Sequence, residues 1–246
     1  MPESGVTSRT APLVAIVDYD MGNIFSVKHA CETVGLTAIV TSSRREIELA
    51  DAVILPGVGA FRDAMDCLKR LDLVGPLRDR ASSGKPVVGV CLGMQLFMSE
   101  SHEFGLRHGL GVIPGSVVHL GAPRDGERVL KVPHVGWNRV RVSGETSTGR
   151  GLGILGPDND GESMYFVHSY VARPDDPAVV VATTRYGDAE FCSVMARDNV
   201  VGFQFHPERS GPAGLRIYSN LSRWLRMRQE SGAGAPFRGH ALRAIS

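Results

Sequence analysis

The chain has 246 residues, 43% of them hydrophobic and 22% charged, a composition typical of a folded globular protein and not of a disordered or fibrous one. Its 27 basic and 26 acidic side chains give a formal net charge of +1, which argues against a nucleic acid or an anionic membrane as partner. No apolar run reaches the roughly 18 residues of a membrane span, and no basic cluster precedes the first run as in a secretion signal, so we expect a cytoplasmic protein.

Short β-branched runs alternate with helical patterns through the first half of the chain. Leu13 to Val17 predicts a strand, and the apolar residues after it recur at helical spacing from Ile24 until Gly35 ends the pattern. Further strands are expected at 37–41, 52–55 and 86–90, and further helices at 44–50, 61–68, 73–82 and 94–100. This order predicts an α/β fold, with a mostly parallel sheet flanked by helices and a ligand crevice at the carboxyl ends of the strands.

The pattern changes after residue 111 to short strands joined by polar turns, which indicates β hairpins added to the sheet. We expect a loop at 143–163 and a closing helix at 215–227. The two ends of the chain, 1–12 and 229–246, are rich in glycine or small polar residues and are expected to be flexible tails around one domain at 13–228. The strands expected in this half are 112–120, 139–142, 164–167, 179–184, 191–195 and 200–205.

Neither the cysteines nor the histidines form a metal or redox motif. The four cysteines are scattered and include no CxxC pair, so we expect four free thiols. The eight histidines include no HExxH and no pair four residues apart on a helix. We therefore predict neither a metal nor a cofactor.

Cys91 is the strongest candidate for a nucleophile. It lies between Gly89 and Gly93 where a predicted strand gives way to a helix, and small flanking residues permit the sharp turn of a nucleophile elbow. The amino end of a helix would also favour the reactive thiolate. A small buried side chain is the better interpretation of an arbitrary cysteine, including Cys31, Cys67 and Cys192. The two glycines and the strand-end position favour the catalytic role for Cys91.

A base for this thiol is expected from another strand end. His206 follows the apolar run 200–205, and Glu208 lies two residues further on, so that it can face the same side and orient the imidazole. The alternative is a loop histidine beside a solvated glutamate. His168 competes for the role of base but has no carboxylate nearby in the sequence.

Acyl transfer also needs donors for the oxyanion. The backbone amide of Leu92 is one donor by the geometry of the elbow, and the glycine-rich loop around Gly57 and Val58 can supply a second. The alternative is an ordinary connection between a strand and a helix.

Six segments in order resemble the class I, or triad, glutamine amidotransferases. LPGVGAF from Leu55, GVCLGMQ from Gly89, YFVHSY from Tyr165 and GFQFHPERS from Gly202 are similar to the motifs of the whole class. DYDMGNIFSV from Asp18 and PHVGWN from residue 133 narrow the resemblance to the glutaminase subunits of imidazole glycerol phosphate synthase, an enzyme of histidine biosynthesis. Asp20 and Arg209 depart from the glycine and the frequent lysine expected there, away from the predicted triad.

The resemblance implies a flavodoxin-like fold and the hydrolysis of glutamine to glutamate, with ammonia passed to a cyclase subunit, a (β/α)8 barrel, within a heterodimer. It implies that Cys91, His206 and Glu208 are the catalytic triad. Gly57, Val58 and Leu92 match the oxyanion site, where a peptide flip is thought to complete the hole when the partner's ligand binds. The residues that match glutamine-binding positions are Gly59, Gln95, Glu103, Ser169 and Tyr170, and those that match the partner interface are Asn23, Trp137, Tyr165 and Arg209.

Three other functions remain open from the sequence. The first is an amidotransferase subunit of another pathway, against which PHVGWN and the methionine of CLGMQ argue. The second is a cysteine peptidase or γ-glutamyl hydrolase on the same kind of sheet, which would act alone. The third is a catalytically silent binding subunit, against which the intact Cys91, His206 and Glu208 argue.

Overall fold

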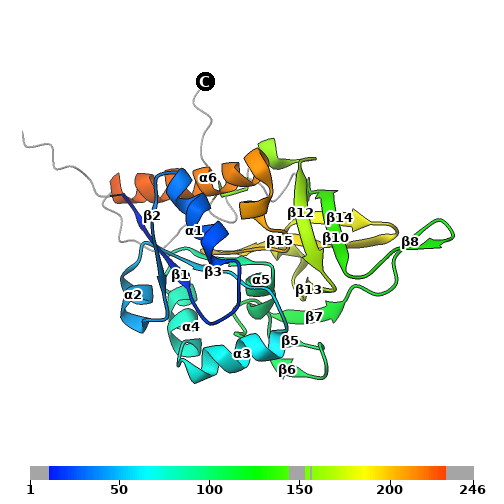
Figure 1. The fold of residues 1–246 in the computed structure, drawn as a ribbon, viewed down its shortest axis with the longest axis horizontal. Helices are drawn as coiled ribbons and strands as arrows, with labels where there is room; N and C mark the ends of the chain where they lie inside the picture. Colours follow the sequence, from blue (N-terminus) through cyan, green and yellow to red (C-terminus); the bar gives the residue numbers. More distant parts are fainter. Residues whose placement is uncertain (1–10, 144–152, 156, 231–246) are drawn as a thin grey trace, which may run out of the picture.

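The structure is a computed structural model that describes residues 11–143, 153–155 and 157–230 (Figure 1). It is built around one eight-stranded sheet with the order β11-β14-β15-β16-β4-β3-β1-β2. The five strands β16, β4, β3, β1 and β2 are parallel to one another, whereas β11, β14 and β15 are added antiparallel. The parallel half therefore has the flavodoxin-like order of a doubly wound sheet. Its strands are β1 (Leu13–Val17), β2 (Thr37–Thr41), β3 (Ala52–Leu55), β4 (Val87–Val90) and β16 (Val200–Phe203).

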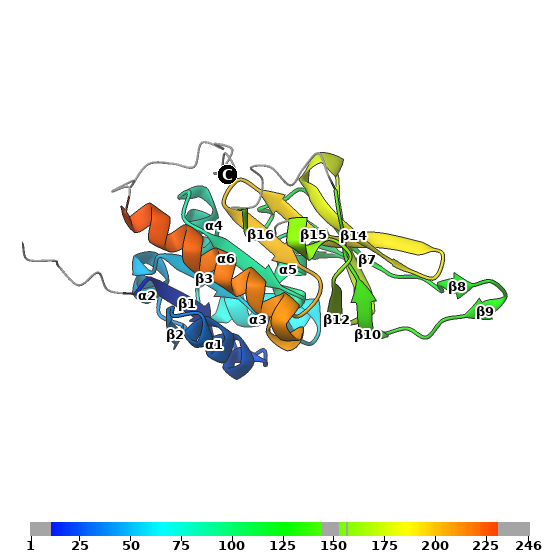
Figure 2. The same ribbon diagram turned by 90° about the horizontal axis from the view of Figure 1, so that it is seen from above.

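Helices cover both faces of this parallel half because its strands are apolar on both sides. Along β1, Val14 and Ile16 pack into one core cluster and Ala15 and Val17 into the other. Alternate residues of a strand point to opposite faces, so a continuous apolar run needs two covering layers. One layer consists of α1 (Ile24–Thr33) and α6 (Gly211–Glu230), and the other of α2 (Arg44–Leu49), α3 (Phe61–Arg70), α4 (Val74–Ser82) and α5 (Leu92–Leu96) (Figure 2).

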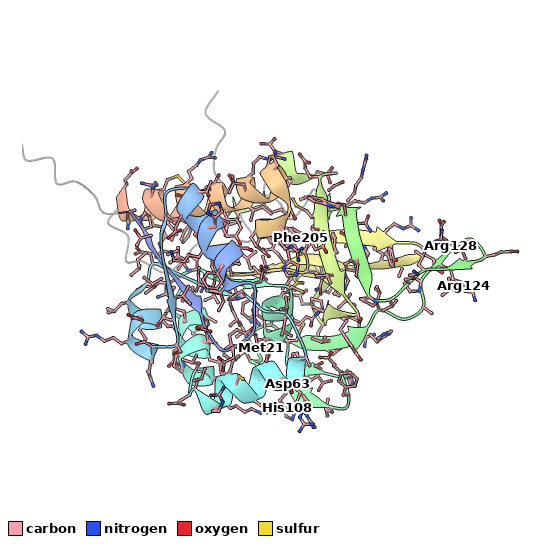
Figure 3. The ribbon with its side chains drawn as sticks, in the orientation of Figure 1. Met21, Asp63, His108, Arg124, Arg128 and Phe205 are labelled. Carbon is pink, nitrogen blue, oxygen red and sulfur yellow. The ribbon has the colours of Figure 1, made fainter. Side chains whose placement is uncertain are left out.

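The added strands form the other end of the molecule. β11 (Arg141–Val142), β14 (Val180–Tyr186) and β15 (Ala189–Arg197) extend the large sheet. β10 (His134–Arg139) pairs with β12 (Ser163–His168), and β8 (Arg124–Asp125) with β9 (Arg128–Val129) in a hairpin whose tip carries Arg124 and Arg128 far from the helices (Figure 3). A small sheet in the order β13-β7-β5-β6 contains β5 (Glu100–Ser101), β6 (Arg107–His108), β7 (Gly115–His119) and β13 (Tyr170–Pro174).

Two predicted elements are wrong in their bounds for one physical reason. The helix expected at 94–100 begins earlier, at Leu92, and ends at Leu96, and the strand expected at 112–120 begins only at Gly115. Backbone amides of residues 110–113 donate to the carbonyls of residues 96–98, which would otherwise continue the helix. A tertiary contact thus ends α5, and it also holds the start of the predicted strand out of the sheet.

The sequence missed β10 and β13 and shortened the last helix. α6 continues to Glu230, two residues into the stretch expected to be a tail. The remainder of the predicted tails, residues 1–10 and 231–246, and residues 144–152 and 156 of the predicted loop at 143–163 lie outside the described residues. Within the described ranges, no helix combines the length and apolarity needed to cross a membrane.

Candidate active site

Three neighbouring parallel strands, β3, β4 and β16, end at the same edge of the large sheet. β3 leads into the Gly57 loop, β4 leads directly into Cys91, and β16 leads through Gln204 to His206. The predicted oxyanion loop, nucleophile and base are therefore neighbours because their strands are neighbours.

Cys91 occupies a strained turn at the end of β4. Its φ of 53° and ψ of −107° lie outside the regions that L-residues ordinarily adopt. The turn is tight because glycines flank it: a Cβ on Gly93 would collide with the carbonyl of Leu55, and one on Gly89 would lie 2.6 Å from the ring of Phe97. This geometry is that of the nucleophile elbow predicted from the sequence.

His206 and Glu208 form a buried pair beside the thiol. The Nδ1 atom of His206 lies 2.8 Å from Oε1 of Glu208, and the two side chains are 1% and 0% exposed. Because Nδ1–H donates to the carboxylate, Nε2 is the ring nitrogen left for Cys91. Burial opposes a charge on His206, but hydrogen bonding with Cys91 and with Glu208 outweighs it and raises the pKa of the imidazole to about 10. The raised pKa keeps the imidazole of His206 protonated at neutral pH, so that Nε2 carries a proton to donate.

Asn23 joins this pair from the loop between β1 and α1. It stands at the amino end of α1 in the left-handed conformation, with φ of 66°, and its side chain makes no capping hydrogen bond to the helix. The side-chain amide instead donates to Oε1 of Glu208, the oxygen that also accepts from His206. A residue predicted at the partner interface thus also orients the carboxylate of the triad.

The predicted oxyanion loop holds its carbonyl toward the elbow. The Leu92 amide donates to the carbonyl oxygen of Gly57 at 3.3 Å, so this donor is already occupied. Tyr19 fixes the start of the loop, since its hydroxyl donates to the carbonyl of Pro56, and a Cβ on Gly57 would collide with that hydroxyl. Gly59 ends the segment with φ of 115°, a conformation suited to glycine. The peptide between Gly57 and Val58 therefore lies between two fixed points.

A cavity of about 260 Å³ opens beside the sulfur of Cys91. Glu103 lies in its wall, and one of its carboxylate oxygens accepts from the amide of Phe61 at 2.6 Å, at the start of α3. Gln95 lies below, donating to the carbonyl of Tyr170 at 2.9 Å. All five predicted glutamine-binding residues line the cavity together with Val58, Cys91 and Leu92; the others in its lining are Pro133, Val167 and His168.

His168 lies at the cavity but its ring nitrogens are engaged elsewhere. Nδ1 lies 3.1 Å from the carbonyl of Tyr170, and Nε2 lies 3.1 Å from Nδ1 of His134. Burial lowers the pKa of His134 to about 4, and burial together with the neighbouring His134 lowers the pKa of His168 to about 3. A neutral imidazole with both nitrogens occupied is poorly placed to act as the base, and this favours His206.

Trp137, Tyr165 and Arg209 form one stack at the surface. Trp137 and Tyr165 are paired across β10 and β12 with ring centroids 6.0 Å apart, and the guanidinium of Arg209 lies 4.5 Å from the centroid of Tyr165. Trp137 is 59% exposed, which excludes a core position for its ring. Three of the four predicted interface residues thus share one patch. The fourth, Asn23, contacts Glu208, the residue that precedes Arg209 in the chain.

All four cysteines are free thiols, as predicted. Among the residues that the structure describes, no cluster of three or more His, Cys, Asp or Glu side chains could hold a metal ion.

Comparison with known proteins agrees with this geometry. The family model described as glutamine amidotransferase class-I matches residues 15–222. The imidazole glycerol phosphate synthase subunit HisH of Syntrophotalea carbinolica is 46% identical over 210 residues, which are 85% of this chain and 98% of that protein. The HisH of Geobacter sulfurreducens is 44% identical over 209 residues, covering 85% and 97% of the two chains.

The chain belongs to the class I glutamine amidotransferases, in the family of HisH subunits. It is therefore a glutamine amidotransferase, and the assignment made from the six motifs is confirmed. Solved structures agree on the fold: PurLQS from Thermotoga maritima superposes with a TM-score of 0.67 at 17% identity over 87% of this chain and 99% of that one. A structure described as glutamine amidotransferase gives 0.64 at 21% identity over 85% and 98%.

The amidotransferase site also contains residues that the sequence did not single out. Gln204 is fully buried, and its side-chain amide lies 3.7 Å from the sulfur of Cys91. Val167 belongs to a segment quoted for the resemblance but was given no role, whereas Pro133, a candidate for the rim of the crevice, does line the cavity. The sequence could have predicted a role for Gln204, because a polar residue between two phenylalanines at the end of a buried strand needs a polar partner.

Proposed function

We propose that the chain is the glutaminase subunit that hydrolyses L-glutamine to L-glutamate and delivers the ammonia to a cyclase subunit, a (β/α)8 barrel, which forms imidazole glycerol phosphate and AICAR. The two subunits act as a heterodimer in the cytoplasm, in histidine biosynthesis. The observation that carries this proposal is the buried Cys91, His206 and Glu208 arrangement at the wall of a cavity sized for a small molecule. The HisH relatives support the choice of pathway.

In the first half-reaction, the thiolate of Cys91 attacks the γ-carbonyl carbon of glutamine. The imidazolium of His206 gives its Nε2 proton to the departing nitrogen, ammonia leaves, and a γ-glutamyl thioester remains. Water then attacks the thioester carbon while His206 removes its proton, and the bond from carbon to sulfur breaks to release glutamate and restore the thiolate. Glu208 keeps Nδ1 protonated throughout and thereby holds Nε2 toward the reacting atoms.

The cavity wall supports glutamine as the substrate. Glu103 has one carboxylate oxygen bonded to the Phe61 amide, and its charge suits the α-amino group of an amino acid. Gln95, Gly59, Ser169 and Tyr170 complete the wall that would hold the rest of the molecule. The oxyanion would form beside Leu92, whose amide becomes available when the peptide between Gly57 and Val58 turns its carbonyl away.

The patch of Trp137, Tyr165 and Arg209 supports a docking face beside the triad. Aromatic and arginine side chains most often anchor protein interfaces. Asn23 links this face to Glu208, so a partner that contacts it lies close to the place where ammonia is released. Direct transfer matters because ammonia that reaches bulk water is protonated and lost as a nucleophile.

The test is an assay of glutamine hydrolysis by the chain alone and with the cyclase and its nucleotide ligand. We expect slow hydrolysis alone, a strong rise in the presence of both, and none by Cys91→Ala under either condition. Trp137→Ala should weaken binding or uncouple glutamate formation from cyclase product, whereas Leu49→Ala, another exposed apolar residue, should do neither.

Full activity of the chain alone, unchanged by cyclase or ligand, would favour a stand-alone γ-glutamyl hydrolase or peptidase. Stimulation by the synthetase of another pathway and not by the cyclase would favour that pathway. A normal rate in Cys91→Ala would remove the nucleophile assignment itself.

A further inference from the structure

Gln204 is a completely buried amide at the end of β16, and the triad as described above does not use it. Its Nε2 atom lies 3.7 Å from Sγ of Cys91, within hydrogen-bonding distance for sulfur. Its neighbours Phe203 and Phe205 are fully buried and pack into an apolar core cluster. Figure 3 shows Phe205 in the interior of the molecule. A buried amide of this kind is costly unless its polar atoms are bonded.

The hydrogen-bond network fixes which end of the Gln204 amide faces the sulfur. The carbonyl of Tyr170 can only accept, so the atom of Gln95 that lies 2.9 Å from it must be the NH2 group. The same NH2 group lies 3.2 Å from Gln204, whose atom there must be the oxygen. The NH2 group of Gln204 therefore points at Cys91, and the assignment does not depend on choosing an amide orientation.

Gln204 and His206 both follow the end of β16 and are two residues apart. The chain bends at Gln204 and Phe205, and His206 then has extended dihedral angles, with φ of −103° and ψ of 93°. Gln204 thus gives one N–H group to the sulfur, while Nε2 of His206, which is buried and has no hydrogen-bond partner among the described residues, is left to exchange a proton with it. The intervening Phe205 is fully buried and packs into the same core cluster as Cys91.

The helix after Cys91 is too short to supply this stabilisation by itself. α5 has five residues, little more than one turn, and the field of a helix terminus grows with the number of aligned peptides. The Leu92 amide, the first of that helix, is bonded to Gly57. A thiolate buried at this position therefore needs a direct N–H donor in addition to the helix.

We propose that Gln204 is a further catalytic residue, whose side-chain N–H group stabilises the thiolate of Cys91 before it attacks and again when it leaves the thioester. The proposal rests on Cys91 being the nucleophile of the proposed function. His206 supplies the proton transfers, and Gln204 supplies a donor that keeps its protons throughout the cycle. Gln95 is the positioning residue of this donor, since it holds the Gln204 oxygen.

The test measures alkylation of Cys91 by iodoacetamide as a function of pH in the full chain, with mass mapping to separate Cys91 from the other three thiols. Gln204→Leu removes the donor without adding charge, and Gln204→Glu keeps the shape and the oxygen that Gln95 needs. For Gln204→Leu we expect alkylation at pH 7 to slow about tenfold, with its pH midpoint about one unit higher, as for the loss of one hydrogen bond to a charged group. Gln204→Glu should slow it further.

Phe205→Leu is the matched control, because it alters core packing one residue away without removing a hydrogen-bond donor. It should leave the pH midpoint of alkylation unchanged even if it lowers the melting temperature. The proposal is overturned if Gln204→Leu or a folded Gln204→Glu alkylates with the midpoint of the unmodified protein, or if Phe205→Leu shifts it equally.

A third measurement needs no variant at position 204. In the unmodified chain, the side-chain amide protons of Gln204 should shift in an NMR spectrum when Cys91 is alkylated, and a shift too small to detect would contradict the contact. If mapping instead places the fast label on another cysteine, the proposed nucleophile is wrong, a result distinct from an unshifted midpoint at a correctly labelled Cys91.

Discussion

The proposed triad and the Gly57 loop lie at the same edge of the sheet, but only the triad has the arrangement that the proposed reaction needs. His206 and Glu208 are buried and bonded to each other, which leaves Nε2 of His206 for the thiol. The loop instead turns the carbonyl of Gly57 onto the amide of Leu92, one of the donors that an oxyanion needs. In the proposed reaction, the nucleophile is thus prepared in the isolated chain, while the proposed oxyanion site is occupied by the carbonyl of Gly57.

This difference follows from what anchors each segment. The proposed triad residues follow central strands and are buried, whereas the loop is held at Pro56 through Tyr19 and ends at Gly59, whose φ of 115° suits glycine. A single peptide between such points can exchange a carbonyl for an amide at small cost. Activation by a partner then needs to act only on the loop, provided that the bound state favours the turned peptide.

The largest expected effect is on the fixed half of the site. His206→Asn should lower the rate of glutamine hydrolysis by about 10² to 10⁴ fold, the range of general acid and base catalysis. Glu208→Gln should cost less, because Glu208 orients the ring without transferring a proton. Steady-state hydrolysis with the cyclase present measures both.

His168→Asn is the comparison variant for that experiment, since His168 borders the cavity with both ring nitrogens engaged. If it proved more damaging than His206→Asn, the base would be His168 and the fixed half of the site would be misassigned.

The next effect is on the loop. Gly57→Ala places a methyl group against the hydroxyl of Tyr19 and should hinder the turn of the peptide. We expect the partner-stimulated rate to fall by about 10² to 10³ fold, the value of one oxyanion donor, while the rate of the isolated chain changes little because its Leu92 amide is already occupied.

Gly75→Ala provides the control, because a Cβ at Gly75 meets nothing within 4 Å. Adding Tyr19→Phe to Gly57→Ala removes the colliding hydroxyl and should restore part of the stimulation. If Gly57→Ala lowered the rate of the isolated chain as much as the partner-stimulated rate, the turn of the loop would not control the activity.

The smallest effect concerns stability beneath the cavity. Burial lowers the folded-state pKa of His134 to about 4 and of His168 to about 3, against an unfolded value near 6.5. The unfolded chain therefore binds protons first, so the free energy of unfolding should be at its full value above about pH 6.5 and fall as the pH drops toward the folded values. The slope is on the order of 1 kcal/mol per pH unit for each histidine.

Urea unfolding between pH 7 and pH 5 measures this slope. His134→Gln should reduce the dependence of the free energy of unfolding on pH by about the contribution of one histidine. The same substitution at the exposed His108 should leave this dependence unchanged. His206 acts in the opposite sense, because its raised pKa stabilises the fold below about pH 6.5 and this contribution is lost as the pH rises toward 10. An unchanged slope in His134→Gln would show that the pair is not held neutral.

The sequence predicted the parts of this molecule that depend on local chemistry. The runs at β1, β3, β4 and β16 are apolar on both faces, which few structures other than a covered parallel sheet can bury, and their order predicts which ends meet. Cys91 between two glycines predicts the elbow because the turn has no room for larger side chains. The residues expected around glutamine line one cavity because they follow such strand ends or their loops.

The tertiary structure decided what depends on partners distant in the chain. The end of α5 is set by backbone amides more than ten residues further along the chain. The role of Asn23 is set by the carboxylate of Glu208, which is distant in the sequence but in contact in the fold. The network that aims Gln204 at Cys91 passes through Gln95 and the carbonyl of Tyr170, three elements that only the folded sheet brings together. The periodicity of apolar residues predicts which face of a helix or strand is buried. The direction of a hydrogen bond, in contrast, is fixed only when both partners are in place.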